Sequence, residues 1–257
     1  MPDSILNQSV TEASVEARDL GIQYRRYLKK SVSLKEAVIG LFKSTEYESF
    51  WALRGLNLTI RPGDSVGLIG PNGAGKSTFL KALAGVLPPS EGALSVQGKV
   101  APLIELGGGF NMELTGRENL YFNGSIMGRS RAEMDTRIEA ISEFADIGDF
   151  LDTPMRSYSS GMRARLGFAA ATDINPDILL LDEIFSVGDE AFRNKATARM
   201  ESFFSANKTI VLVSHSMSMI KRYANRVIYL AKGQVVAQGA PEEVIEQYLE
   251  DVAQQSK

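Results

Sequence analysis

Short apolar runs alternate with longer amphipathic stretches along most of this 257-residue chain. Such alternation predicts strands followed by helices and is typical of a mainly parallel sheet that helices cover. Several apolar runs contain no polar residue, as expected for central strands that are buried on both faces. We therefore predict an α/β fold, with its clearest strands at residues 15–24, 56–60, 66–69, 178–181, 209–214 and 227–230.

Two predicted hairpins interrupt this parallel pattern. Each consists of two short β-type runs separated by a glycine-containing turn, which is typical of a β-hairpin. The two hairpins are residues 93–100, which turn at Gln97-Gly98, and residues 227–237, which turn near Lys232-Gly233. We expect them to form antiparallel pieces at the flanks of the main sheet.

The strand pattern disappears between about residues 111 and 161. Two S/T-x-x-E capping boxes, which mark helix starts, stand in this stretch: Thr115 with Glu118, and Ser130 with Glu133. We predict an inserted helical subdomain at about residues 111–165.

We predict a single domain at residues 1–240, into which the helical subdomain is inserted, followed by a tail. An extra segment at about residues 28–50 separates the first two strands and contains a third capping box, Ser33 with Glu36. Pro241 and the two glutamates after it are typical of a first helical turn. We therefore predict a C-terminal helical tail at residues 241–257.

Composition narrows the classes of function. The net charge is −3, and no block of Lys and Arg stands out, so we expect no nucleic-acid partner. The absence of cysteine and the single histidine argue against thiolate chemistry and an imidazole-rich metal site. No apolar run approaches the roughly 18–20 residues of a spanning helix. The N-terminus lacks the pattern of a secretory signal, so we expect the chain to stay in the cytosol.

A glycine-rich segment carries the clearest chemistry. It matches G-x-x-x-x-G-K-[ST] and stands between an apolar strand and a helical run, where a phosphate-binding loop belongs. Backbone N–H groups and the helix N-terminus would surround phosphate oxygens, Lys76 would reach the β and γ phosphates, and Ser77 would ligate Mg²⁺. A chance Gly-Lys-Ser in a turn is the alternative, which the context disfavours. The segment is Gly70, Pro71, Asn72, Gly73, Ala74, Gly75, Lys76, Ser77 and Thr78.

Two carboxylates end the apolar strand at residues 178–181. Strand ends in open α/β sheets face the ligand crevice, so Asp182 could hold Mg²⁺ while Glu183 polarises a water aimed at the γ-phosphate. A strand that simply stops at a solvated acidic turn is the alternative. The phosphate loop makes the metal interpretation the better one.

Two further polar positions have ordinary structural explanations. Ser159 precedes a strong helix pattern, and from the residues alone a helix N-cap is its favoured role, with Gly161 leaving the backbone open. His215 follows the strand predicted at 209–214. A lone histidine is usually structural or exposed, although its place at a strand end leaves a catalytic role open.

Taken together, these residues resemble the ATP-binding subunits of ABC transporters, from about residue 15 to residue 238. The motifs stand in that family's order: phosphate loop, signature at residues 158–162, magnesium aspartate Asp182, catalytic glutamate Glu183, a loop ending at Asp189, and switch histidine His215. The resemblance implies a RecA-like phosphate-loop ATPase fold that takes ATP and Mg²⁺.

The resemblance also implies how the site works. Two copies would sandwich two ATP molecules, each site combining the phosphate loop of one copy with Ser159 and Gly161 of the other. His215 would contact the γ-phosphate, and an aromatic residue near the first strand would stack on adenine. Tyr24 is our candidate for that aromatic residue, with Trp51 as the alternative.

Three departures from the usual family pattern point to one branch. The signature reads Tyr-Ser-Ser-Gly-Met instead of Leu-Ser-Gly-Gly-Gln, Glu105 stands nearest to the usual glutamine and becomes a candidate metal ligand, and an insertion separates the first two strands. These features are similar to bacterial exporters of O-antigen, capsule and teichoic acid chains. The resemblance therefore implies an ATPase that powers export of lipid-linked polysaccharide through a separate transmembrane permease, of which two copies would be present. The ATPase would lie peripherally on the cytoplasmic face of the inner membrane.

Other functions remain as alternatives. A small-solute importer or a lipid exporter would use the same ATPase, although an importer would more often show the usual signature and glutamine. A soluble ATPase acting on DNA or ribosomes is disfavoured, because only one modest helical insertion separates Ser77 from Ser159 and the chain has one cassette. A non-catalytic cassette would lack Glu183 or His215, and both are present.

Overall fold

The computed structural model describes residues 13–27, 47–103, 109–173, 175–182 and 189–255. The strands are β1 (Val15–Tyr27), β2 (Tyr47–Ile60), β3 (Ser65–Ile69), β4 (Glu91–Val96), β5 (Val100–Leu103), β6 (Ile178–Asp182), β7 (Thr209–Val213), β8 (Arg226–Ala231) and β9 (Gln234–Gly239). The helices are α2 (Lys76–Leu83), α3 (Gly116–Ile126), α4 (Arg131–Asp135), α5 (Ile138–Ala145), α6 (Ser160–Thr172), α7 (Glu190–Ser205), α8 (Met217–Tyr223) and α9 (Pro241–Gln255), with 3-10 turns η2 (Gly148–Asp152) and η3 (Met155–Ser157).

The central sheet has six strands in the order β5-β6-β7-β3-β8-β9. Its first five strands are parallel, and β9 pairs antiparallel with β8 at the edge. Strand β7 is buried at every position, as the apolar run that follows Thr209 predicts. The predicted α/β fold with a mainly parallel sheet is confirmed.

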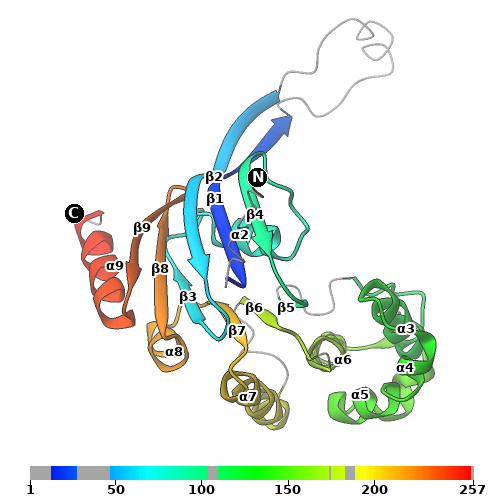
Figure 1. Cartoon of the computed structure of the whole chain (residues 1–257). Coiled ribbons are helices and arrows are strands. Elements are labelled where there is room, and N and C mark those ends of the chain that lie inside the picture. Colours follow the sequence, from blue (N-terminus) through cyan, green and yellow to red (C-terminus); the bar gives the residue numbers. More distant parts are fainter. Residues whose placement is uncertain (1–12, 28–46, 104–108, 174, 183–188, 256–257) are drawn as a thin grey trace, which may run out of the picture.

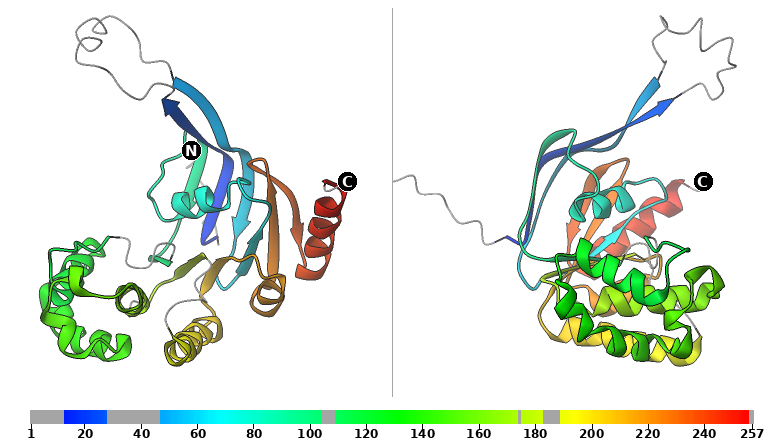
Figure 2. Two further views of the ribbon diagram at one scale, coloured as in Figure 1. Left: turned by 180° about the vertical axis from the view of Figure 1, so that it is seen from behind. Right: turned by 90° about the vertical axis from the view of Figure 1, so that its right-hand side faces the viewer.

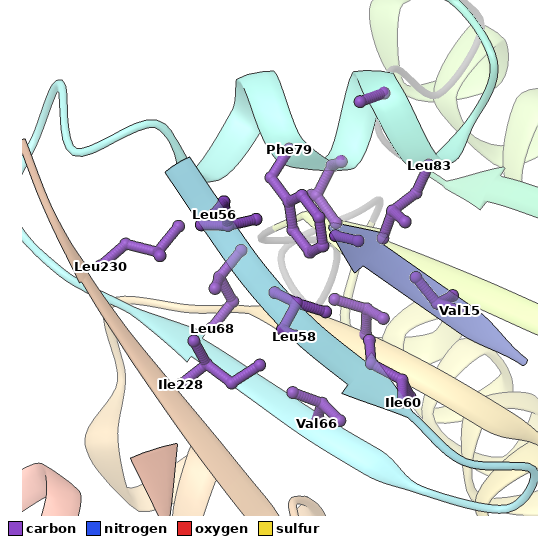
Figure 3. Packing of buried hydrophobic residues seen from close by; sticks show 14 of the residues in the cluster. Val15, Leu56, Leu58, Ile60, Val66, Leu68, Phe79, Leu83, Ile228 and Leu230 are labelled. Atoms are coloured by element: carbon purple, nitrogen blue, oxygen red, sulfur yellow. The ribbon is translucent and has the colours of Figure 1, made fainter. Parts of the chain in front are cut away.

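A second sheet of three antiparallel strands, in the order β2-β1-β4, covers one face of the first. Figure 3 shows side chains from β1, β2, β3 and β8 meeting Phe79 and Leu83 of α2 in one buried cluster. The opposite face of the central sheet packs against α6, α7, α8 and α9 through a separate cluster. The central sheet is therefore buried on both faces, which fixes the positions of its strand ends.

The helical region, α3 to α6 with η2 and η3, has a hydrophobic cluster of its own. In Figures 1 and 2 this region lies at the opposite end of the molecule from α9. Both predicted capping boxes form: Thr115 and Ser130 each accept a hydrogen bond from the backbone of the glutamate three residues later. Ser159 is the N-cap of α6, as its sequence context predicts.

Most of the predicted elements agree with the structure, although some of them differ in their bounds. The hairpin of β8 and β9 forms at Lys232-Gly233, and α9 begins at Pro241. Strands β1 and β2 are longer than predicted, and α2 begins at Lys76, inside the glycine-rich segment. The capping box Ser33 with Glu36 lies outside the described residues.

The hairpin predicted at residues 93–100 is wrong. Strand β4 pairs with β1, whereas β5 pairs in parallel with β6 in the other sheet. Around Gly98 the chain passes from one sheet to the other, and the Lys99 amide donates to Asp177 Oδ2 at 2.8 Å. Beside β6, Ala101 and Leu103 become buried, which pairing with the exposed strand β4 would not achieve. Within the described ranges, no helix combines the length and apolar character needed to cross a membrane.

Candidate nucleotide-binding site

Three parallel strands bring the predicted site residues to one edge of the central sheet. Val213 at the end of β7 is in register with Leu68 of β3 on one side and with Asp182 of β6 on the other. The glycine-rich loop follows β3, and His215 comes two residues after β7. The carboxyl ends of these strands therefore meet where α/β sheets form their ligand crevices.

The loop between β3 and α2 has a backbone that depends on glycine. Gly70 has φ 145°, and a Cβ atom there would overlap the carbonyl oxygen of Leu230. Gly75, the N-cap of α2, has φ 104° in the left-handed region. The Ala74 amide donates to the carbonyl of Pro71 at 3.2 Å and closes the turn. These conformations let the backbone of the loop curl around the start of α2.

Lys76 is held inside this curl. Its side chain is buried, and its Nζ donates to the carbonyl oxygens of Gly70 at 2.7 Å and Pro71 at 3.0 Å. The first turn of α2 contains no acidic residue. The lysine charge and the positive end of the helix therefore add at the same place, and such a place attracts an anion.

A cavity of about 450 Å³ lies over the loop. Asp182 and His215 line it from the sheet side, and Lys76 and Ser77 line it from α2. Carboxylate and hydroxyl oxygens are the ligands that Mg²⁺ prefers when phosphates complete its shell. The donors present therefore fit a magnesium–nucleotide complex. The lining residues are Tyr24, Phe50, Trp51, Ala52, Asn72, Gly73, Ala74, Gly75, Lys76, Ser77, Thr78, Asp182, Val213 and His215.

Aromatic residues of β1 and β2 form one wall of this cavity. Tyr24 and Phe50 are register partners, and their rings stack with centroids 5.6 Å apart. Trp51 also lines the cavity, but its ring packs against Gly21, and the Arg54 guanidinium lies 5.1 Å from its centroid. Sequence reasoning missed Phe50 because it placed the start of β2 at residue 56. The aromatic run Phe50-Trp51 opposite Tyr24 was the signal that could have found it.

The signature residues lie apart from this cavity. Ser159 accepts a hydrogen bond from the Met162 amide at 3.1 Å, and a Cβ atom on Gly161 would meet only Ser159 Oγ, at 3.8 Å. Neither residue is among those that line the cavity. The structure thus separates Ser159 and Gly161 from the phosphate loop of the same chain, and it leaves Gly161 with open space beside it.

Other predicted residues stand elsewhere. Asp189 is the N-cap of α7, where it accepts from the Phe192 amide at 2.9 Å, and Arg165 of α6 lies 3.5 Å from its carboxylate. Glu183 and Glu105 lie outside the described residues.

Comparison with known proteins gives one family. Residues 53–186 match the ABC transporter family. The chain is 47% identical over 199 residues to ABC transporter protein AbcA of Aeromonas salmonicida, 77% of this chain and 65% of that protein. It is 42% identical to O-antigen export system ATP-binding protein RfbB of Klebsiella pneumoniae, over 82% of this chain and 86% of that protein. It is 41% identical to teichoic acids export ATP-binding protein TagH of Listeria monocytogenes serotype 4b, over 93% of this chain and 70% of that protein.

Solved structures share the fold. The cassette MJ0796, described as a dimer in a post-hydrolysis state bound to ADP and Pi, superimposes with a TM-score of 0.67 at 22% identity, covering 88% of this chain and 98% of that one. Because this chain spans 65% of AbcA, the remaining part of that relative lies outside the match.

Proposed function

The chain belongs to the ABC transporter family, and from this premise we propose that it binds and hydrolyses ATP to drive transport. The observation that carries the proposal is the single cavity lined by the phosphate loop, Asp182 and His215. One edge of the sheet brings together backbone N–H groups that can bind phosphate, a buried lysine, oxygen atoms that can ligate a metal, and an imidazole. This combination suits phosphoryl transfer to water.

Each residue then has a role. Backbone N–H groups of the loop and the Lys76 ammonium bind the phosphates, and Ser77 and Asp182 hold Mg²⁺. Bound Mg²⁺ supplies charge neutralisation on the phosphate oxygens. Glu183 orients the attacking water, and His215 contacts the γ-phosphate, as the family resemblance implies. Glu105 stays a candidate for the metal shell.

Adenine, in this proposal, stacks on the wall formed by Tyr24 and Phe50. The Phe50 side chain is 51% exposed, so it offers open aromatic surface, whereas the Trp51 ring already packs against Gly21 and Arg54. Replacing Tyr24 with Ala should weaken ATP binding about 5- to 150-fold, since stacking on a nucleobase contributes about 1–3 kcal/mol. Trp51→Ala should weaken it less. Fluorescence titration with a labelled ATP analogue compares the two.

We further propose that the working unit is a pair of copies. The separation of Ser159 and Gly161 from the cavity of their own chain supports sites that combine one phosphate loop with the partner's signature segment. Mixing a Lys76→Ala copy with a Ser159→Arg copy tests this. Each variant alone should be inactive, but in a mixed pair one site has both of its halves intact. Recovery of phosphate release on mixing is expected, and its absence would overturn the two-copy site.

The proposed cargo is lipid-linked polysaccharide, moved by a separate pair of membrane permease subunits, with this chain peripheral on the cytoplasmic face. Support comes from relatives named for export of O-antigen and of teichoic acids, two polymers of different chemistry.

The test is Glu183→Gln in cells, with surface polysaccharide measured against lipid-linked polysaccharide retained inside. Retained polymer with a bare surface is expected. Normal surface glycan with a folded, ATP-binding but hydrolysis-dead protein would contradict the export assignment while leaving the ATPase assignment standing.

A further inference from the structure

The Tyr158 side chain of the signature segment is anchored to η2, which precedes it in the helical region. It is buried, and its ring packs edge-on against Phe150 with centroids 6.2 Å apart. Its hydroxyl donates to the carbonyl oxygen of Phe150 at 2.6 Å. The usual leucine at this signature position could not make that bond, so tyrosine ties the signature segment to η2.

The same hydroxyl lies against the first residue of α3. Gly116 is buried, and a Cβ atom there would overlap the Tyr158 hydroxyl oxygen. Burial raises the pKa of this hydroxyl, and the backbone N–H of Gly116 acts in the opposite direction. The hydroxyl therefore occupies the space that a side chain at residue 116 would need.

We propose that Gly116 and Tyr158 form an interlock that positions Ser159 and Gly161 for the partner's nucleotide. Ser159 follows Tyr158 directly and is the N-cap of α6, so displacement of the Tyr158 ring moves the cap and the helix start together. Tyr158 and Gly116 are positioning residues and touch no nucleotide. This inference rests on the two-copy site proposed above.

The neighbouring contacts make the interlock stiff. The Met155 amide donates to the carbonyl of Leu114 and the Arg156 amide to that of Met112, both at 2.9 Å. Thr115, the N-cap of α3, also forms an isolated β-bridge with Pro154. The segments before α3 and before the signature thus run together, and the Tyr158 hydroxyl closes the contact at the end where the signature begins.

Gly116→Ala tests the interlock with an effect opposite to the one that helix propensity predicts. Alanine in place of glycine ordinarily stabilises a helix. Here the new methyl group should displace Tyr158. In the Glu183→Gln background, which on the proposed role of Glu183 should bind ATP without hydrolysing it, we expect ATP-dependent pairing of the full chain to weaken about tenfold, the scale of one lost hydrogen bond. Binding of a fluorescent ATP analogue to the unpaired chain should not change, because the phosphate loop is untouched.

A second substitution should rescue the first. With Tyr158→Phe the clashing oxygen is gone, and the nearest atoms to a Cβ on residue 116 become the carbonyl of Leu151 at 3.1 Å and the ring carbon of residue 158 at 3.3 Å. The double variant Gly116→Ala with Tyr158→Phe should pair as well as Tyr158→Phe alone. Gly124→Ala is a crowding control in the same helix: its methyl group would overlap Sδ and Cγ of the buried Met134, at 2.5 and 2.6 Å, and it should leave exchange at the Met162 amide unchanged.

The rate of hydrogen exchange at the Met162 amide, which donates to Ser159, reports on the interlock in the unpaired chain. Exchange should speed up in Gly116→Ala and return toward the Tyr158→Phe rate in the double variant. Unchanged exchange in Gly116→Ala, or a double variant no better than Gly116→Ala, would overturn the interlock. If the parent chain neither binds ATP nor pairs, the proposed function fails, and the exchange experiment still decides the interlock.

Discussion

The start of α2 after the phosphate-binding loop and the start of α6 at the signature segment are held in place by different kinds of contact. In the loop, Lys76 bonds to carbonyls only five and six residues away, and the strand, loop and helix are contiguous in sequence. The signature segment and the residues just before it are held by residues 112–116, which lie far earlier in the chain, as well as by Phe150. The loop should therefore fail when its own residues change, whereas the signature segment should also respond to substitutions far from it in sequence.

The largest expected effect comes from Lys76→Ala in the loop. Removing the buried ammonium takes away the charge that binds phosphates, so ATP hydrolysis should fall about 100-fold or more. Phosphate release and titration with a labelled ATP analogue measure the two effects. Lys221→Ala, at an exposed position of α8, is the control. Hydrolysis at the parent rate in Lys76→Ala would contradict the claim that the loop depends on its own residues.

Gly70→Ala tests whether the backbone of the loop is as constrained as it looks. The added methyl group would overlap the Leu230 carbonyl, and we expect a loss of about 3 kcal/mol in the free energy of unfolding. Gly73→Ala in the same loop has φ 78° but no atom within 4 Å, so it should lose only about 1 kcal/mol. Urea denaturation compares the two, and equal losses would contradict the crowding argument.

Asp173→Asn tests how far the helical region depends on contacts between residues that are distant in sequence. This carboxylate is 8% exposed and pairs with Arg129 at 2.7 Å and Arg137 at 2.5 Å, joining the end of α6 to the segments before α4 and α5. Its loss should lower the free energy of unfolding by about 2 kcal/mol and speed hydrogen exchange across the helical region first. The comparison Asp152→Asn removes a more exposed partner of Arg117 and should change little. Equal exchange in both variants would contradict the prediction.

The smallest effect concerns pH at the start of α4. Hydrogen bonds from the backbone and hydroxyl of Ser130 lower the pKa of Glu133 from its ordinary value of 4.5. A carboxyl whose pKa is lower in the folded state stabilises it above the unfolded value, and this contribution disappears as the pH falls through the folded value. The protection factors of the α4 amides, in which the intrinsic pH dependence of exchange is removed, should therefore fall below about pH 4.5. Ser130→Ala should weaken this pH dependence, and an unchanged profile would argue against it.

Local patterns in the sequence were enough to predict the elements that depend on neighbours in sequence. The phosphate loop, both described capping boxes, the Ser159 cap and the β8–β9 hairpin involve residues within a few positions of each other. Apolar runs similarly predicted four strands of the central sheet, β3, β6, β7 and β8. The hairpin at residues 93–100 failed because the turn sequence looked the same whether the chain reversed or passed to another sheet.

By itself, then, the sequence determined the α/β class, the phosphate loop and the identity of the residues that end the strands. Only the tertiary structure decided that Asp182 and His215 meet the loop in one cavity, that Phe50 stacks with Tyr24 while the Trp51 ring packs against Gly21, and that Gly116 leaves space for the Tyr158 hydroxyl. The physical reason is range. Turn, cap and periodicity preferences act between neighbouring residues, whereas strand order and the contact between residues 116 and 158 follow from burial of apolar surface shared by distant segments.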